Sequence, residues 1–200
     1  MRGSNSGVQA SCETTFLTTD SLTSQAVAQY WKSIALTAEE NLVVQALRVL
    51  DGNIERVAWV GVPRSFAHSG RGGMLVKYKG SDYPIPIGSL GDGMWRMCCI
   101  AVALIRSRGG ILLVDEIDTG LHYSTLHEMW GLVLQTAERL GIQVFATTHS
   151  SDCINSLASV CREERPGQVS MQRLEAGNRM AVSYSEDEIW SASQHGIETR

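Results

Sequence analysis

The sequence predicts an α/β fold built on a mostly parallel sheet. Two short, largely apolar segments, Ile111–Asp115 (ILLVD) and Gln143–Thr147 (QVFAT), are typical of strands that are buried on both faces. The segment 123–141 between them has the apolar spacing of a helix, and strands that alternate with helices indicate a layered α/β domain. We expect the two strands to be adjacent and parallel, because one helical crossover joins them.

Length and composition narrow the class of protein. The 200 residues suffice for one sizeable core, and 44% of them are apolar. The formal net charge of -4 argues against a protein that binds nucleic acid with its whole surface. No apolar run has the length of a membrane span, and the start MRGSNSGVQAS has no signal-peptide core, so we expect a cytoplasmic protein. The five cysteines lack CxxC spacing, which favours reduced thiols.

The N-terminal half is expected to begin with a tail and to continue with two helices and two strands. We interpret residues 1–20 as a flexible tail or an expression scar, and residues 21–200 as one domain. Apolar spacing predicts helices over 22–31 and 37–50, the second with a capping box formed by Thr37 and Glu40. The segments 54–62 and 73–80 have the composition of strands and flank a turn-rich stretch.

The C-terminal half is expected to hold most of the helices. Apolar segments predict helices over 94–106 and 152–160, and Gly141 is expected to cap the crossover helix. The segment 167–184 is expected to form a hairpin that turns at EAGN (175–178). A short helix capped by Ser185 and Glu188 follows it.

Three segments place polar groups at the end of a predicted strand or the start of a predicted helix. SLGDG (Ser89–Gly93) opens a helix, whose exposed N–H groups and positive dipole end suit a phosphate. Asp115 and Glu116 end the first apolar strand, where Asp115 suits a Mg²⁺ ligand and Glu116 the polarisation of an attacking water. His149 follows the second strand, where a neutral imidazole could bond to a phosphate or to a water.

Each segment also has an ordinary structural interpretation. The first could be a Gly-rich turn that caps a helix, the second a pair of solvated acids, and the third a polar residue with a local partner. All three, however, lie where ligands bind in parallel sheets, at the carboxyl ends of strands and the starts of helices. This common placement favours one shared site.

The segments PIGSLGDGMWRM, ILLVDEIDTGLHYS and VFATTHSSD resemble the signature motif, the Walker B motif with D-loop, and the switch-histidine loop of ABC-type ATPases. The resemblance covers about residues 22–200, and it is stronger to the prokaryotic AAA-family ATPases near the OLD and SMC proteins than to transporter subunits. It implies a three-layer, P-loop-NTPase-like fold with a mostly parallel sheet. It also implies ATP and Mg²⁺ as cofactors.

By position, the resemblance assigns roles to the signature segment. Ser89, Gly91 and Asp92 match the residues that contact the γ-phosphate of a nucleotide held by a partner subunit. Arg96, one helical turn further on, could support the signature helix or contact phosphate.

The resemblance assigns the catalytic roles to the other two segments. Asp115 matches the magnesium aspartate, Glu116 the catalytic glutamate and His149 the switch histidine. In the D-loop, His122 stands where transporter-type members carry Asp, so its role stays open.

The chain departs from the family pattern in one respect. It contains no GxxxxGK[ST] segment, and its three lysines, Lys32, Lys77 and Lys79, follow no such loop. We therefore interpret the chain as the C-terminal lobe of such an ATPase without the N-terminal P-loop lobe, and we expect it to be inactive alone. It would be an isolated domain, a truncated gene product or one half of a split protein.

Two functions fit these observations. In the first, the chain provides an incomplete ATP-binding and ATP-hydrolysing site that a P-loop-bearing lobe or subunit completes in trans. The alternative is a non-catalytic interaction module, or a truncated remnant of such an ATPase. A second copy of the chain is a further possible partner, because either it or the C-terminal hairpin is expected to cover the edge strand Gln143–Thr147. Nucleic acid is a partner by family analogy only.

Overall fold

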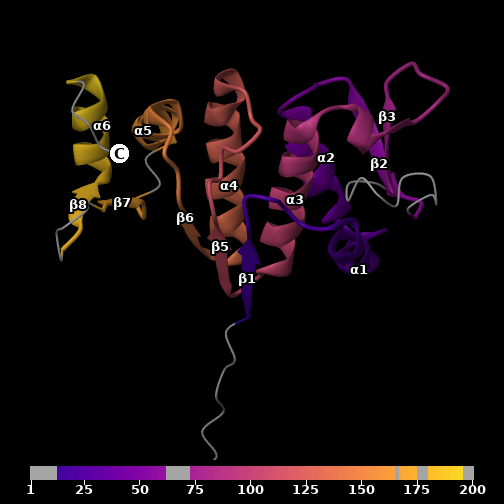
Figure 1. Ribbon diagram of the computed structural model, residues 1–200, viewed down its shortest axis with the longest axis horizontal. Coiled ribbons are helices and arrows are strands. Elements are labelled where there is room, and N and C mark those ends of the chain that lie inside the picture. The colour runs from indigo at the N-terminus through magenta and orange to yellow at the C-terminus, as the bar shows by residue number, and fades with distance from the viewer. Residues whose placement is uncertain (1–12, 62–72, 165–166, 175–179, 196–200) are drawn as a thin grey trace, which may run out of the picture.

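The chain folds into an α/β structure with three separate sheets (Figure 1). The computed structural model describes residues 13–61, 73–164, 167–174 and 180–195. The elements follow in this order: β1 (Thr14–Leu17), α1 (Ser24–Ile34), α2 (Glu40–Arg48), β2 (Ile54–Trp59), β3 (Met74–Tyr78), β4 (Ile85–Pro86), the 3-10 turn η2 (Ile87–Ser89), α3 (Asp92–Arg106), β5 (Ile111–Val114), the 3-10 turn η3 (Tyr123–Thr125), α4 (Leu126–Leu140), β6 (Gln143–Ala146), α5 (Ser151–Glu164), β7 (Ser170–Arg173), β8 (Val182–Ser185) and α6 (Glu186–Gln194).

The parallel sheet has the strand order β1-β5-β6. Ile111 of β5 lies opposite Gln143 of β6, and the two strands run parallel, which confirms the adjacent arrangement predicted for them. β1 pairs in parallel with the other side of β5, so the tail expected over residues 1–20 does not extend through Thr14–Leu17. A Cβ atom at Gly110 would collide with the carbonyl oxygen of Glu13, so glycine is what allows β1 to approach β5 here. Only two of the four residues of this strand (TTFL) are apolar, so its pattern does not stand out in the sequence.

The parallel sheet has one covered face and one exposed face. Leu112 and Val114 point to the covered face, where they are at most 2% exposed and belong to the main core. On the opposite face Phe16, Leu113 and Phe145 lie in one cross-strand row. Phe16 is 57% exposed and Phe145 is 52% exposed, so this row forms an apolar surface. We call these three residues the exposed row.

β6 is the outer strand of this sheet within the described residues, because β7 and β8 pair with each other in a sheet of their own. The expectation that this strand forms an edge is confirmed for this part of the chain. The prediction that it is buried on both faces is wrong, because Phe145 is 52% exposed on one of them. The C-terminal hairpin does not pair with it. An apolar run indicates that a strand can be buried, but whether a neighbour covers it depends on the rest of the fold.

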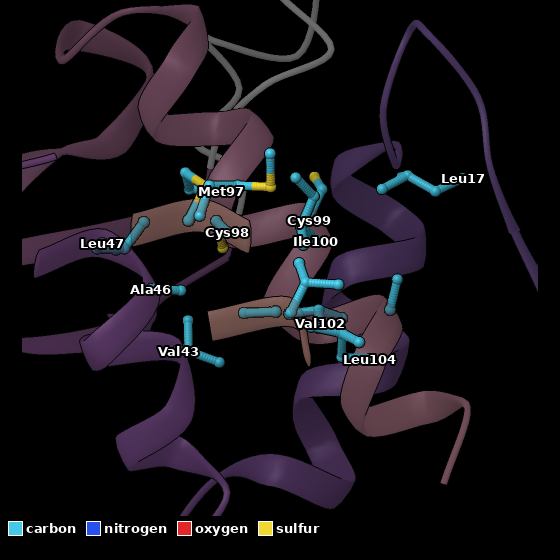
Figure 2. Close-up of a cluster of buried hydrophobic side chains, with 14 of the residues drawn as sticks. Leu17, Val43, Ala46, Leu47, Met97, Cys98, Cys99, Ile100, Val102 and Leu104 are labelled. Carbon is cyan, nitrogen blue, oxygen red and sulfur yellow. The ribbon is translucent and has the colours of Figure 1, made fainter. Parts of the chain in front are cut away.

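The core is organised around α3. Each residue from Met94 to Leu104 is buried, so this helix is enclosed on all sides. Figure 2 shows its side chains between those of α2, where Val43 and Leu47 lie, and Leu17 of β1. The helix thus joins the parallel sheet to the N-terminal helices.

The two smaller sheets lie at opposite ends of the molecule (Figure 1). β2 and β3 are antiparallel, as their composition predicted in outline, and the turn-rich stretch between them falls mostly outside the described residues. β7 and β8 form the predicted hairpin, whose turn at 175–178 also lies outside them. No helix in the described ranges is both long and apolar enough to cross a bilayer.

The predicted helix caps are partly confirmed. Ser185 and Glu188 form the expected capping box at α6, and Gly141 caps α4 in the left-handed conformation, with φ 64°. The capping box predicted for Thr37 and Glu40 is wrong, since α2 begins only at Glu40. The hydroxyl of Thr37 instead donates to the carbonyl of Ile34, the last residue of α1.

The two faces of the parallel sheet lead to a test with a matched pair of variants. We expect Leu112→Ala to lower the free energy of unfolding by about 2–5 kcal/mol, because it opens a cavity in the core. Leu113→Ala, the next residue on the exposed face, should cost about half of that or less, since its side chain is only half-buried. Urea denaturation of both variants measures the difference. Equal losses would contradict the assignment of the faces.

Candidate functional site

The acid pair, Asp115 and Glu116, leaves the carboxyl end of β5 in a tight turn. Both residues are half-buried. Glu116 has φ 43°, a left-handed conformation that costs a non-glycine residue about 1–2 kcal/mol. Such a conformation persists only where neighbouring groups hold it.

One of these groups is Thr147, which follows β6. Its hydroxyl donates a hydrogen bond to Oδ1 of Asp115 at 2.7 Å and accepts one from the backbone N–H of Glu116 at 2.9 Å. The backbone of Thr147 continues the ladder between the two strands. Its N–H donates to the carbonyl of Val114 at 2.9 Å, and its carbonyl accepts from the N–H of Ile117 at 3.0 Å.

The second group is the guanidinium of Arg96 on α3, which is only 2% exposed. Nη2 donates to the carbonyls of Asp115 and Glu116 at 2.7 and 2.8 Å. Nη1 donates to the carbonyl of Thr18, at 2.6 Å, and to the hydroxyl of Ser21, at 3.3 Å. Burial lowers the pKa of Arg96, and the acidic groups around it oppose that shift. Of the two roles expected for Arg96, support and phosphate contact, the structure favours support.

His149 lies beside the acid pair. Its Nε2 is 3.9 Å from Oε1 of Glu116, and its side chain is 88% exposed. The other oxygen of Glu116, Oε2, accepts a hydrogen bond from the hydroxyl of Thr119 at 3.3 Å. The structure therefore brings together Asp115, Glu116 and His149, which the sequence placed at the ends of two strands. We call these three residues the acid–histidine cluster.

Ser89, Gly91 and Asp92 lie elsewhere, at the exposed start of α3. Gly91 is the N-cap and has φ 92°, which favours glycine. At Gly93 a Cβ atom would lie 2.7 Å from the carbonyl oxygen of Gly120, so the helix start packs closely on the loop that follows the acid pair. This contact links the expected phosphate-binding segment to that loop.

Several polar residues around the acid–histidine cluster were not predicted from the sequence. The hydroxyl of Thr148 donates to Oδ1 of Asp118 at 2.6 Å and thus ties the loop of His149 to the loop after the acid pair. Thr147 and Thr119 were also overlooked. The two threonines before His149 carried a usable signal, because parallel strands end at the same sheet edge and bring such hydroxyls beside the acids.

His122 has a structural role in this arrangement. Its Nδ1 lies 2.9 Å from the hydroxyl of Ser124 and accepts from the N–H of Ser124 at 3.4 Å, so it caps the 3-10 turn η3. Its ring also lies beside that of Tyr123, with 4.3 Å between the ring centroids. These contacts are local and stabilise the turn in which His122 lies.

The donors of the acid–histidine cluster fit a Mg²⁺ ion that other groups complete. Thr147 occupies Oδ1 of Asp115, while Oδ2 accepts no hydrogen bond from the described residues. In these residues no group of three or more His, Cys, Asp or Glu side chains is arranged to hold a metal ion. Mg²⁺ in nucleotide sites is commonly held by one or two carboxylates, substrate phosphates and water, so a single free carboxylate oxygen is an adequate protein contribution.

The support role of Arg96 makes a stability prediction. Arg96→Met should lower the free energy of unfolding by about 3 kcal/mol or more, because it leaves several carbonyls without a donor. Arg106→Met on the same helix should cost at most about 1 kcal/mol, since Arg106 is exposed and its contacts with Glu13 and the Tyr30 ring lie at the surface. Thermal and urea unfolding compare the two variants. A similar cost for both would contradict the role of Arg96.

The sequence matches one domain family and one sequence relative. A family model described as "AAA domain, putative AbiEii toxin, Type IV TA system" (AAA_21) matches residues 58–153, a range that includes the start of α3 and the acid–histidine cluster. An ATP/GTP phosphatase of Helicobacter pylori is 27% identical over an alignment of 146 residues, and the match covers 70% of this chain and 35% of that protein. The chain thus spans about a third of the length of this relative.

The chain is also similar to solved structures of SMC proteins. One, described for its ATP-driven dimerization and DNA-stimulated activation, matches with a TM-score of 0.52 and 13% identity over 87% of this chain and 99% of that chain. An SMC head bound to the C-winged helix domain of ScpA has a TM-score of 0.48 and 14% identity, over 74% of this chain and 42% of that one. The first match shows a P-loop-NTPase-like α/β fold. Together with the family match and the sequence relative, this fold supports an AAA/SMC-like ATPase domain.

Proposed function

We propose that the chain contributes the acid–histidine cluster and the start of α3 to a composite site that binds and hydrolyses ATP with Mg²⁺. The observation that carries the proposal is the meeting of Asp115, Glu116 and His149, with Nε2 of His149 at 3.9 Å from Oε1 of Glu116. A pair of solvated acids would need neither the strained backbone of Glu116 nor the buried guanidinium of Arg96 behind it.

Within this site the three residues have different tasks. Asp115 offers one carboxylate oxygen as a ligand, because Thr147 already holds the other. Bound Mg²⁺ would neutralise charge on the phosphates. The carboxylate of Glu116 is 44% exposed and can accept a proton from, and orient, an attacking water. The imidazole of His149 is exposed beside it and can hydrogen-bond to the terminal phosphate or to that water.

The start of α3 is proposed to contact a nucleotide held by a partner. Ser89 and Gly91 are exposed, and Gly91 has no side chain that could cap the helix. The positive end of the helix dipole lies at this exposed start, where it suits a phosphate. Asp92 is included in this proposed contact because it belongs to the same segment.

We place the P-loop on another lobe or subunit, which docks beside β6. The chain holds no GxxxxGK[ST] segment in its 200 residues. The edge of β6 and the exposed row (Phe16, Leu113 and Phe145) offer backbone hydrogen-bonding groups and apolar surface at one place. A second copy of the chain is the other candidate for this surface.

Hydrolysis tests the proposal. The chain alone should bind ATP weakly and hydrolyse almost none, since hydrogen bonds from the start of α3 contribute only about 1.5–3 kcal/mol each before the costs of association. Once a P-loop-bearing lobe is supplied, ATP hydrolysis should appear, and Glu116→Gln should lower kcat by about a hundredfold or more while nucleotide stays bound. Phosphate release and nucleotide binding measure the two effects.

Glu138→Gln is the matched control, because Glu138 is an exposed glutamate on α4, apart from the acid pair. It should leave hydrolysis unchanged. Robust hydrolysis by the chain alone that Glu116→Gln abolishes would mean that the phosphate cradle lies within these residues. Hydrolysis that is indifferent to Glu116→Gln would favour the alternative, a non-catalytic interaction module.

The docking surface has its own test. Phe145→Ser should weaken association with the P-loop-bearing lobe, or with a second copy, by about tenfold or more, because Phe145 is half-exposed and would be buried on docking. The free energy of unfolding of the chain should change little. Tyr83→Ser is the control, since Tyr83 is 81% exposed and precedes β4 in the antiparallel sheet. Light scattering and calorimetric titration measure association, and equal affinities for both variants would contradict this docking site.

A further inference from the structure

We propose that Thr147 is a positioning residue that orients both acids of the site through one hydroxyl group. The inference rests on the proposed function, because it concerns how Asp115 and Glu116 are held for hydrolysis. Thr147 is uncharged and stands two positions before His149.

The hydroxyl of Thr147 makes a donor contact and an acceptor contact that cannot be exchanged. It has one proton, and a carboxylate can only accept, so the proton lies on the line to Oδ1 of Asp115, at 2.7 Å. The N–H of Glu116 can only donate, so it meets a lone pair of the same oxygen, at 2.9 Å. One hydroxyl therefore sets the orientation of the Asp115 carboxylate and of the Glu116 peptide together.

The contact to Asp115 decides which carboxylate oxygen can bind a cation. Oδ1 already accepts from Thr147, so Oδ2 is the oxygen that no described residue occupies with a hydrogen bond. Without the hydroxyl the carboxylate could rotate about its last bond, and the two oxygens would become equivalent. Loss of the hydroxyl should therefore weaken the use of Mg²⁺.

The contact to Glu116 holds one side of its strained backbone. The N–H is bound by Thr147, while the carbonyl accepts from Nη2 of Arg96 at 2.8 Å and from the N–H of Thr119 at 3.0 Å. The peptide groups on both sides of the Glu116 Cα atom are thus fixed. The carboxylate itself has a single long hydrogen bond, 3.3 Å from the Thr119 hydroxyl, and remains available to a water.

The position of Thr147 depends on the parallel sheet and not on its own side-chain preferences. Its N–H bonds to Val114, the last residue of β5, and its carbonyl bonds to Ile117, which follows β5. The strand register therefore brings the hydroxyl to the acids. The hydroxyl of its neighbour Thr148 points to a different acid, Asp118, at 2.6 Å. The two threonines therefore form a matched pair with separate partners.

The test uses three variants of the full chain. Thr147→Val keeps the branched shape and removes the hydroxyl, whereas Thr147→Ser keeps the hydroxyl. Thr148→Val removes the neighbouring hydroxyl as the control. Thr147 is exposed, so its variants should fold with an unchanged unfolding midpoint, which is measured first.

The first measurement is hydrogen exchange of the Glu116 amide by NMR in the 200-residue chain. We expect this amide to exchange about tenfold faster or more in Thr147→Val, and at the wild-type rate in Thr147→Ser and Thr148→Val. Unchanged protection of the Glu116 amide in Thr147→Val would overturn the proposal. This measurement needs neither ATP nor a partner.

The second measurement is ATP hydrolysis in the presence of the P-loop-bearing lobe. Thr147→Val should lower kcat by about tenfold to a hundredfold and raise the Mg²⁺ concentration for half-maximal rate, with little change in KM for ATP. Thr147→Ser should restore most of the rate. Equal kcat in both Thr147 variants would overturn the proposal. A wild-type assembly without hydrolysis would contradict the proposed function, and with it any catalytic effect of Thr147, while the amide measurement would still confirm or contradict the hydrogen bond.

Discussion

The parallel register of β5 and β6 is the constraint on which the candidate site depends. Val114 lies opposite Ala146, so the chain leaves both strands at the same edge and places the acid pair beside Thr147. The backbone bonds of Thr147 to Val114 and Ile117 extend the ladder one step further. A shift of one residue would turn every side chain of β6 to the other face and remove the Thr147 hydroxyl from Asp115.

The acid turn also depends on a charge that is buried behind it. Arg96 belongs to a helix that is buried on all sides. Its guanidinium donates hydrogen bonds to the backbone carbonyls of Asp115 and Glu116 and not to their carboxylates. Its four hydrogen bonds join three stretches of chain, α3, the segment after β1 and the turn at Glu116. The buried helix thereby fixes the backbone of Glu116, while the carboxylate of Glu116 stays available for hydrolysis in the proposed function.

The parallel sheet has one face packed into the core and one face exposed to solvent. Its covered side belongs to the main core, whereas Phe16 and Phe145 remain more than half-exposed on the other side. In the proposed function this contrast separates two tasks. The chain holds the acids in place before any ligand arrives, and docking at the exposed face brings the phosphates, so hydrolysis is coupled to assembly.

The sequence by itself determined the elements that a local pattern encodes. The helix over 94–106, the two apolar strands, the cap at Gly141 and the polar groups at the strand ends all follow from the order of neighbouring residues. Only the tertiary structure decided that Thr14–Leu17 is a strand, that β6 is exposed, and that Arg96 and Thr147 hold the acid turn. The physical reason is distance along the chain. Thr147 and Asp115 are 32 positions apart, and their hydrogen bond exists only after the sheet has aligned the two strands.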